Sequence, residues 1–294
     1  MNQIWSNQIQ GIDMLYLSRK LRFADEYQKA FQNLFGIQDC SKESVQILEI
    51  GCGPGALAES LQRWYPKAKI TGIDRDSEFI EFARRKVKGV TFLTGDAVSL
   101  PFADASFDVT ISNTVCEHIE PSKFYREQMR VLKPGGICLV LSSRKGISIS
   151  ADCLNPTEAE NRFWERAMEL HQDIVQRYGI GKYALSEKEL PLTMERYGFS
   201  EVSVGYVMEE FTPDSCTCET EKALEIIEAD RREELEAVAM IEKNHTGLFQ
   251  TEEFREVRQM ICQRYEKRVQ LYLEGKHQWD TKTAVIMVVR GEKT

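Results

Sequence analysis

The chain has 294 residues, of which 42% are hydrophobic and 29% are charged, as in ordinary globular proteins. This composition excludes collagen-like repeats, wholesale disorder and small folds held together by disulfides. The formal net charge of −8 argues against nucleic acid and anionic membranes as partners, so we expect a small-molecule or protein substrate. The apolar runs are too short to cross a bilayer and the first residues lack a cationic leader, which together predict a cytoplasmic location.

Strand-length apolar runs alternate with amphipathic helical segments between residues 45 and 141. This alternation predicts strand–helix units that form a mostly parallel sheet. Because parallel strands are covered on both faces, they appear as short runs with little charge. The predicted strands are residues 46–50, 69–74, 90–94, 107–112 and 137–142, and the helices between them are residues 55–65, 77–86 and 121–132. The sequence 133–136, Lys-Pro-Gly-Gly, is expected to form a turn after the last of these helices.

Residues outside this region are expected to be mainly helical. An amphipathic helix is predicted near residues 20–35, and others at 157–178, 187–197, 219–243 and 251–274, with two more strands at 201–208 and 283–290. The resulting sheet has about seven strands. We therefore predict an N-terminal helical cap (1–44), a core (45–150), a helical insertion (151–186), a core continuation (187–210), a second helical insertion (211–282) and a last core strand (283–294).

A glycine-rich turn, Gly51-Cys52-Gly53-Pro54-Gly55, joins the first buried strand to the first core helix. Glycines at such a turn adopt positive φ and leave room for a ligand against the main chain, and the following helix offers free N–H groups. The spacing also fits the dinucleotide-binding pattern Gly-x-Gly-x-x-Ala, so the turn alone leaves a nicotinamide or flavin site open. A phosphate-gripping loop is excluded because no Gly-Lys-Ser/Thr follows.

Two carboxylates follow the next two strands. Asp74 ends the second strand, where its two oxygens are suited to accept hydrogen bonds from both hydroxyls of a ribose. Asp96 and Ala97 follow the third strand, and they would read adenine through its exocyclic amine and a ring nitrogen. The alternative for Asp74 is a helix-capping role for the helix that begins near Ser77.

Five motifs in this order resemble the class I S-adenosylmethionine-dependent methyltransferases, in particular the quinone-biosynthesis C-methyltransferases and many small-molecule methyltransferases. They are residues 48–55 (LEIGCGPG), 72–74 (GID), 95–97 (GDA), 100–108 (LPFADASFD) and 130–136 (RVLKPGG). The resemblance implies a Rossmann-like α/β fold with a seven-stranded, mostly parallel sheet, helices on both faces and helical lid insertions. It also implies that the last strand, 283–290, lies antiparallel between its neighbours.

The resemblance further implies that S-adenosyl-L-methionine is the cofactor and that a small molecule accepts the methyl group. The cofactor-binding positions implied in this way are Glu49, Gly51, Cys52, Gly53, Gly55, Asp74, Arg75, Asp96, Ala97 and Asn113. If the acceptor must lose a proton, His118 and Glu117 are the candidate bases, since they follow the fourth strand. Several of these residues have a purely structural alternative: Glu49 and Arg75 as paired charges, Asn113 as a turn residue and His118 as a wall of the pocket.

Two other functions remain open at this point. An NAD-dependent oxidoreductase would share the glycine turn and Asp74, and a non-catalytic adenosyl-ligand sensor would share the whole pocket. No metal site is predicted, because the histidines are scattered and Cys216 and Cys218 have no second pair. Aromatic residues in the cap and the insertions favour an apolar or aromatic acceptor.

Overall fold

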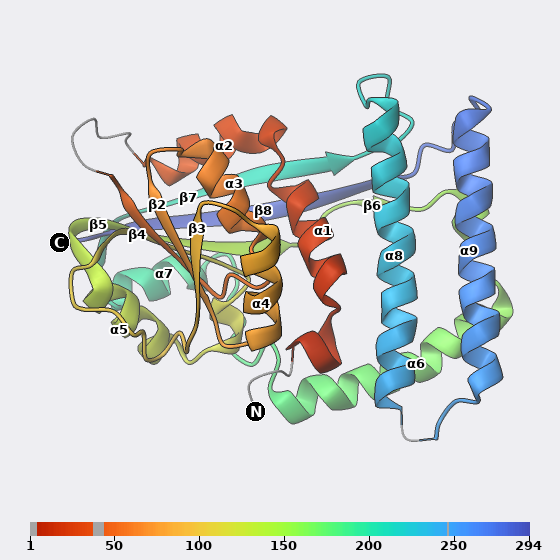
Figure 1. Ribbon diagram of the computed structural model, residues 1–294, viewed down its shortest axis with the longest axis horizontal. Coiled ribbons are helices and arrows are strands. Elements are labelled where there is room, and N and C mark those ends of the chain that lie inside the picture. Colours follow the sequence, from red (N-terminus) through yellow and green to blue (C-terminus); the bar gives the residue numbers. More distant parts are fainter. Residues whose placement is uncertain (1–4, 38–43, 246) are drawn as a thin grey trace.

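One mixed sheet organises the part of the chain that the computed structural model describes, residues 5–37, 44–245 and 247–294 (Figure 1). Within these residues it has eight strands, and the order along the main path is β3-β2-β1-β4-β5-β8-β6, with β7 paired to β8. The strands are β1 (Gln46–Ile50), β2 (Lys69–Asp74), β3 (Val90–Thr94), β4 (Phe107–Asn113), β5 (Leu132–Arg144), β6 (Ser148–Ile149), β7 (Phe199–Phe211) and β8 (Thr281–Lys293). The sequence predicts about seven strands, and the additional strand in the structure is β6, which has only two residues.

Strands β1 to β5 run parallel to one another, whereas β8 runs antiparallel to β5 on one side and to β7 on the other. The expectation of an antiparallel last strand between two neighbours is therefore confirmed. At the end of this antiparallel pair that lies next to α8, Phe211 of β7 pairs with Lys282 of β8.

Helices cover both faces of the sheet, as expected. On one face, α1 (Ile12–Arg22), α2 (Gln28–Phe35), α3 (Ala56–Trp64) and α4 (Ser77–Lys86) pack over a core that includes Phe31, Leu61 and Ile80. On the other, α5 (Pro121–Val131) and α7 (Glu189–Arg196) cover a core with Phe124 and Met194. Burial of these side chains supplies most of the driving force for folding.

Three further helices form a separate wing beside the sheet: α6 (Glu158–Tyr178), α8 (Thr220–Asn244) and α9 (Thr251–Leu273). Figure 1 shows α8 and α9 side by side, with α6 crossing near one end and α1 between α8 and the sheet. The wing is joined to the ends of β7 and β8 by Arg268 of α9, whose fully buried guanidinium contacts Asp214 at 2.9 Å and Asp280 at 2.6 Å.

The structure corrects two expectations about local structure. The single helix predicted at 20–35 is wrong, because the chain forms α1, a 3₁₀ turn (Asp25–Tyr27) and α2. The break follows Phe23, whose carbonyl accepts a hydrogen bond from Ser60 Oγ at 2.7 Å instead of continuing the helix. The turn predicted at 133–136, between a helix and a strand, is also wrong. The strand β5 already begins at Leu132, so residues 133–136 lie within it, at the point where its pairing with β4 shifts register.

Residues 38–43 of the predicted cap, with Cys40, lie outside the described residues, as do residues 1–4. Among the helices that the structure describes, none combines the length and the apolar character that crossing a membrane requires.

Candidate functional site

A cavity of about 640 Å³ lies at the carboxyl ends of strands β1 to β4. Its floor consists of the glycine turn after β1, Asp74 and Arg75 after β2, residues 95–98 after β3, and residues 113–115 after β4. Its roof comes from the N-terminal segment and from the end of α6 and the loop that follows it: Trp5, Ile9, Leu15, Arg19, His171, Val175, Ile180 and Tyr183. The topology of parallel strands therefore brings the predicted cofactor residues together, because their carboxyl ends share one edge of the sheet. Gly55 is the exception, since it does not line the cavity.

The glycine turn has the backbone geometry that only glycine adopts without strain. Gly51, Gly53 and Gly55 have φ of +68°, +51° and +89°. The N–H of Gly51 donates to the Ile73 carbonyl at 2.8 Å, which fixes the turn against β2. A Cβ on Gly51 would lie 2.4 Å from Val115 Cγ2, whereas a Cβ on Gly53 would meet nothing closer than 3.5 Å. Gly51 is thus required for packing, and Gly53 leaves its main chain open to the cavity.

Asp74 orders the turn as well as lining the cavity. Its Oδ2 accepts a hydrogen bond from the Gly53 N–H at 2.9 Å, and its Oδ1 accepts one from the Asp76 N–H at 2.9 Å. Each carboxylate oxygen retains a second lone pair for a ligand. Burial raises the pKa of Asp74, while the two backbone N–H groups act in the opposite direction. The side chain is therefore pre-oriented by the turn that it helps to hold.

Glu49 lies deeper, with 2% of its surface exposed. Burial, and then the charge of Asp74, raise its pKa well above the ordinary range. Its Oε2 has no hydrogen-bond partner among the described residues, although the residue lines the cavity. Cys52 is also buried there, and burial raises the pKa of its thiol. A buried thiol in this state is unreactive, so Cys52 contributes shape to the pocket.

Asp96, Ala97 and Arg75 also line the cavity. Asp96 is exposed, and its Oδ1 accepts a hydrogen bond from the Val98 N–H at 3.1 Å. Its second oxygen has no hydrogen-bond partner among the residues that the structure describes and can accept from a ligand. Arg75 is exposed at the rim.

The end of β4 supplies an unpaired polar atom. The Oδ1 of Asn113 is buried and has no hydrogen-bond partner among the described residues, in a side chain that lines the cavity. A buried oxygen without a partner is unfavourable by about 1–3 kcal/mol unless a ligand or water satisfies it. The next residue, Thr114, has φ of +54°, a conformation that a non-glycine residue adopts only under strain. The end of β4 thus presents an unpartnered oxygen beside a strained residue at the wall of the cavity.

The two candidate bases are placed differently. His118 lines the cavity, packs edge-on against the Trp5 ring at 4.8 Å, and accepts a hydrogen bond at Nδ1 from the Gly181 N–H at 2.9 Å. Burial lowers its pKa, so the ring is neutral at pH 7 and its proton resides on Nε2. Glu117 does not line the cavity. Its Oε1 accepts a hydrogen bond from Ser142 Oγ at 2.7 Å instead.

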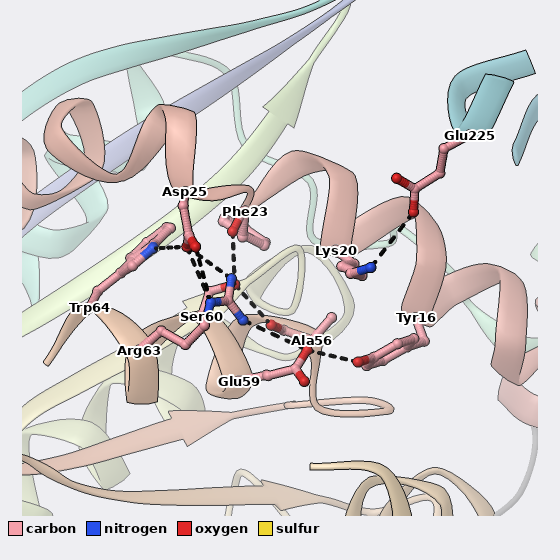
Figure 2. A network of polar contacts seen from close by, with 10 residues as sticks. All are labelled: Tyr16, Lys20, Phe23, Asp25, Ala56, Glu59, Ser60, Arg63, Trp64 and Glu225. Carbon is pink, nitrogen blue, oxygen red and sulfur yellow. Dashed lines mark hydrogen bonds and ion pairs between the residues drawn. The ribbon is translucent and has the colours of Figure 1, made fainter. Parts of the chain in front are cut away.

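A polar network holds the roof helix α1 on the core. Figure 2 shows Tyr16 of α1 donating to Glu59 of α3 at 2.7 Å, and Asp25 just after α1 accepting from the Trp64 indole at 2.9 Å and pairing with Arg63 at 3.0 Å. On its outer side α1 contacts α8 through Lys20 and Glu225, 3.6 Å apart. These contacts fix α1 over the glycine turn.

Arg19 on α1 is a cavity residue that sequence reasoning missed. Its guanidinium lies 3.3 Å from Thr114 Oγ1. Burial, and then the positive charge of Arg22, lower its pKa. No pattern in the sequence Ser18-Arg19-Lys20-Leu21-Arg22 distinguishes this arginine from a solvated one on a helix surface.

Other residues considered from the sequence lie elsewhere. Cys216 and Cys218 precede α8 and do not line the cavity. Within the ranges that the structure describes, no group of three or more histidine, cysteine, aspartate or glutamate side chains is arranged to hold a metal ion.

The part of the chain that forms the floor of this cavity is similar to known methyltransferases. Residues 48–140 match the family model described as a methyltransferase domain. Over 130 residues the chain is 37% identical to a fatty-acid O-methyltransferase of Mycolicibacterium smegmatis, a match that covers 43% of each chain. Over 150 residues it is 33% identical to norajmaline N-methyltransferase of Rauvolfia serpentina, covering 48% of each. The matched part thus spans less than half the length of either relative.

The fold as a whole is similar to that of a solved structure, phosphoethanolamine N-methyltransferase 2 of Haemonchus contortus in complex with S-adenosyl-L-methionine. The TM-score is 0.52 at 17% sequence identity, and the match covers 99% of this chain and 59% of the other. At this identity the likeness concerns the fold alone.

Proposed function

We propose that the protein transfers a methyl group from S-adenosyl-L-methionine to a small molecule. The match of residues 48–140 to the methyltransferase domain model supports this proposal. The observation that carries the proposal is the convergence of the glycine turn, Asp74 and Asp96 on one cavity of about 640 Å³. The two relatives named above support the acceptor class, since their names specify a fatty acid and an alkaloid as acceptors.

The residues of the cavity match the parts of the proposed cofactor. Gly53 leaves its backbone open, Asp74 has free lone pairs for the ribose hydroxyls, and Asp96 with Ala97 presents an acceptor and an N–H for adenine. The unpartnered Oδ1 of Asn113 would accept a hydrogen bond from the methionine ammonium group. When bound, the cofactor supplies a methyl group already activated by a positively charged sulfur, so the protein's main task is alignment.

The chain's own residues would position the acceptor and exclude water. Trp5, Leu15 and Val175 close the cavity with apolar surface. His118, which lines the cofactor cavity, would orient the reacting end of the acceptor by donating from Nε2, since its Nδ1 is already occupied by the Gly181 N–H. As a base it would first have to change tautomer. Glu117 would act on His118 only through its charge, because its carboxylate binds Ser142.

The proposal is tested by calorimetry with S-adenosylhomocysteine and with NAD⁺, followed by assays of labelled methyl transfer to a panel of small molecules. We expect the first ligand to bind and NAD⁺ not to bind. The Asp74→Ala variant should lose affinity for S-adenosylhomocysteine about tenfold or more, while the exposed Asp173→Ala serves as control. Binding of NAD⁺ in place of S-adenosylhomocysteine would identify an oxidoreductase, and cofactor binding without transfer to any acceptor would favour a sensor.

A further inference from the structure

A second cavity of about 280 Å³ opens from the first between α1, α8 and the hairpin of β7 and β8. Both cavities are lined by Gln10, Arg19 and Thr114, so they meet at this point. The second cavity adjoins the cofactor cavity on the side of Thr114, after β4. It is therefore placed to hold a second molecule beside the cofactor.

Two arginines of α1, Arg19 and Arg22, line this second cavity three residues apart, and neither has an acidic partner. Arg19 donates to Thr114 Oγ1 at 3.3 Å, and Arg22 donates to Ser143 Oγ at 3.0 Å. Among the residues that the structure describes, no carboxylate lies within ion-pairing distance of either guanidinium. Two partly buried cations satisfied only by hydroxyl groups are unfavourable in the absence of an anion.

The acidic groups around the arginines do not neutralise them. Glu209 of β7 is fully buried, and neither of its oxygens has a hydrogen-bond partner among the described residues. Burial raises its pKa to about 8, against the partial opposition of Arg22 and Arg19, so it is mainly uncharged at pH 7. Asp230 and Glu233 line the cavity too, but they share one cation, Lys282, at 3.3 and 3.2 Å. The lining thus holds three cations and two carboxylates, and an excess of positive charge remains at the arginines.

Apolar side chains of four elements line the cavity as well. They are Met14 and Leu21 of α1, Phe211 of β7, Ile226 and Ala229 of α8, and Ala284 of β8. These side chains offer contact surface for an alkyl or aryl body beside the polar part of the lining. Arginine, with its planar fork of donors, is suited to carboxylate and phosphate groups.

We propose that the second cavity is the acceptor site and that it selects an amphiphilic acceptor with an apolar body and an oxyanion, either carboxylate or phosphate, bound by Arg22 together with Arg19. The proposal rests on the function proposed above and specifies its substrate class. It refines the expectation of an apolar or aromatic acceptor by adding a negative charge. The cavity of about 440 Å³ within the wing has no comparable excess of positive charge, since its carboxylates pair with Lys282, Arg264 and Arg268.

A series of probes that differ only in the head group tests the charge preference. Octanoate, octyl phosphate, 1-octanol and octylamine are titrated into the full chain saturated with S-adenosylhomocysteine, and binding is followed by calorimetry. We expect one or both anions to bind about tenfold or more tightly than the alcohol and the amine. The stronger anion distinguishes carboxylate from phosphate. Equal affinity for all four probes overturns the proposal, and so does a result in which neither anion binds measurably.

Variants locate the preference at the arginines. Arg19 borders both cavities, and the cofactor also has a carboxylate, so Arg22, which lines only the second cavity, is the discriminating residue. Arg22→Met should lose the preference for the anions at least tenfold, and Arg22→Lys should restore part of it. Lys20→Met is the matched control, because Lys20 lies on the same helix, is exposed and pairs with Glu225. A preference that persists unchanged in both Arg22 variants overturns the assignment.

The same samples separate the two proposals. Affinity for S-adenosylhomocysteine is measured first, and Arg22→Met should leave it unchanged because Arg22 does not line the cofactor cavity. If the wild-type chain does not bind S-adenosylhomocysteine, the proposed function fails. If it binds S-adenosylhomocysteine but shows no preference among the four probes, only the acceptor class fails.

Discussion

Replacing Glu209 by glutamine should make the protein less sensitive to rising pH. Glu209 is fully buried on β7, and burial raises its pKa from 4.5 to about 8. Between these two values the folded state holds a proton that the unfolded state has released. The free energy of unfolding contributed by this group therefore falls as pH rises through this window.

The size of the effect follows from the two pKa values. Each pH unit in the window lowers the free energy of unfolding by about 1.4 kcal/mol, which amounts to about 5 kcal/mol over the whole interval from pH 4.5 to 8. Solvent does not screen the charge of this carboxylate, because the residue is 0% exposed. Below pH 4.5 the carboxyl is neutral in both states, so the contribution there is constant.

Urea unfolding of the wild type and of Glu209→Gln, at intervals from pH 5 to pH 8, measures this contribution as the difference between the two proteins. We expect the variant to gain stability relative to the wild type as pH rises. Glu210→Gln provides the control, since Glu210 is the exposed neighbour on the same strand. A wild-type-minus-variant difference that stays constant from pH 5 to 8 would refute the reasoning, because Glu209 would then titrate alike in both states.

Three further predictions concern the site and the wing. Asp96→Ala should weaken binding of S-adenosylhomocysteine about tenfold or more in calorimetry, because a charged acceptor is lost; unchanged affinity would remove Asp96 from the site. Gly51→Ala should lower the free energy of unfolding by about 1–3 kcal/mol more than Gly275→Ala in urea unfolding. The φ values, +68° and +69°, are nearly equal, but only Gly51 would place a Cβ against Val115, so equal losses would contradict this account. Arg268→Met should lower the free energy of unfolding by about 3–5 kcal/mol, since it leaves the carboxylates of Asp214 and Asp280 without their partner. A loss below about 1 kcal/mol would show that these ion pairs are not formed.

The core strands were predictable because parallel strands covered on both faces must be short and apolar. The predicted ends of β1, β2 and β3 are those of the structure. The helix α4 was predicted to the residue for a similar reason: Asp76 caps it by accepting from the Glu78 N–H, and Val87 ends it in an extended conformation. Local chemistry determines these boundaries, so the sequence reveals them.

Boundaries that depend on distant residues were not predictable. The helix expected at 20–35 is interrupted because Ser60, on α3, binds the Phe23 carbonyl. The early start of β5 depends on pairing between Leu132 and Phe107 of β4. In both cases the decisive partner is far along the chain, and no local pattern announces it.

The candidate site shows the same division. The floor could be predicted, because Gly51, Asp74 and Asp96 each follow a strand whose direction is fixed by the sheet. The two arginines of α1 could not, because Arg19 and Arg22 differ from surface arginines only through the docking of α1 between α3 and α8. The side chain of Glu117 was also beyond sequence reasoning, since its direction is determined by the hydroxyl of Ser142 on β5.

The pairing of Phe211 with Lys282 has a consequence for how this architecture diversifies. The chain leaves the sheet after β7 for α8 and α9 and returns into β8 beside the residue at which it left. The segment between the two strands can therefore be lengthened, shortened or exchanged without altering the pairing of β7 with β8. The methyltransferase family model ends at residue 140, before that excursion begins. Under the proposed function, the floor of the cofactor cavity lies within residues 48–140, whereas the walls of the acceptor cavity come mainly from α1, α8, β7 and β8, so one part can change while the other is preserved.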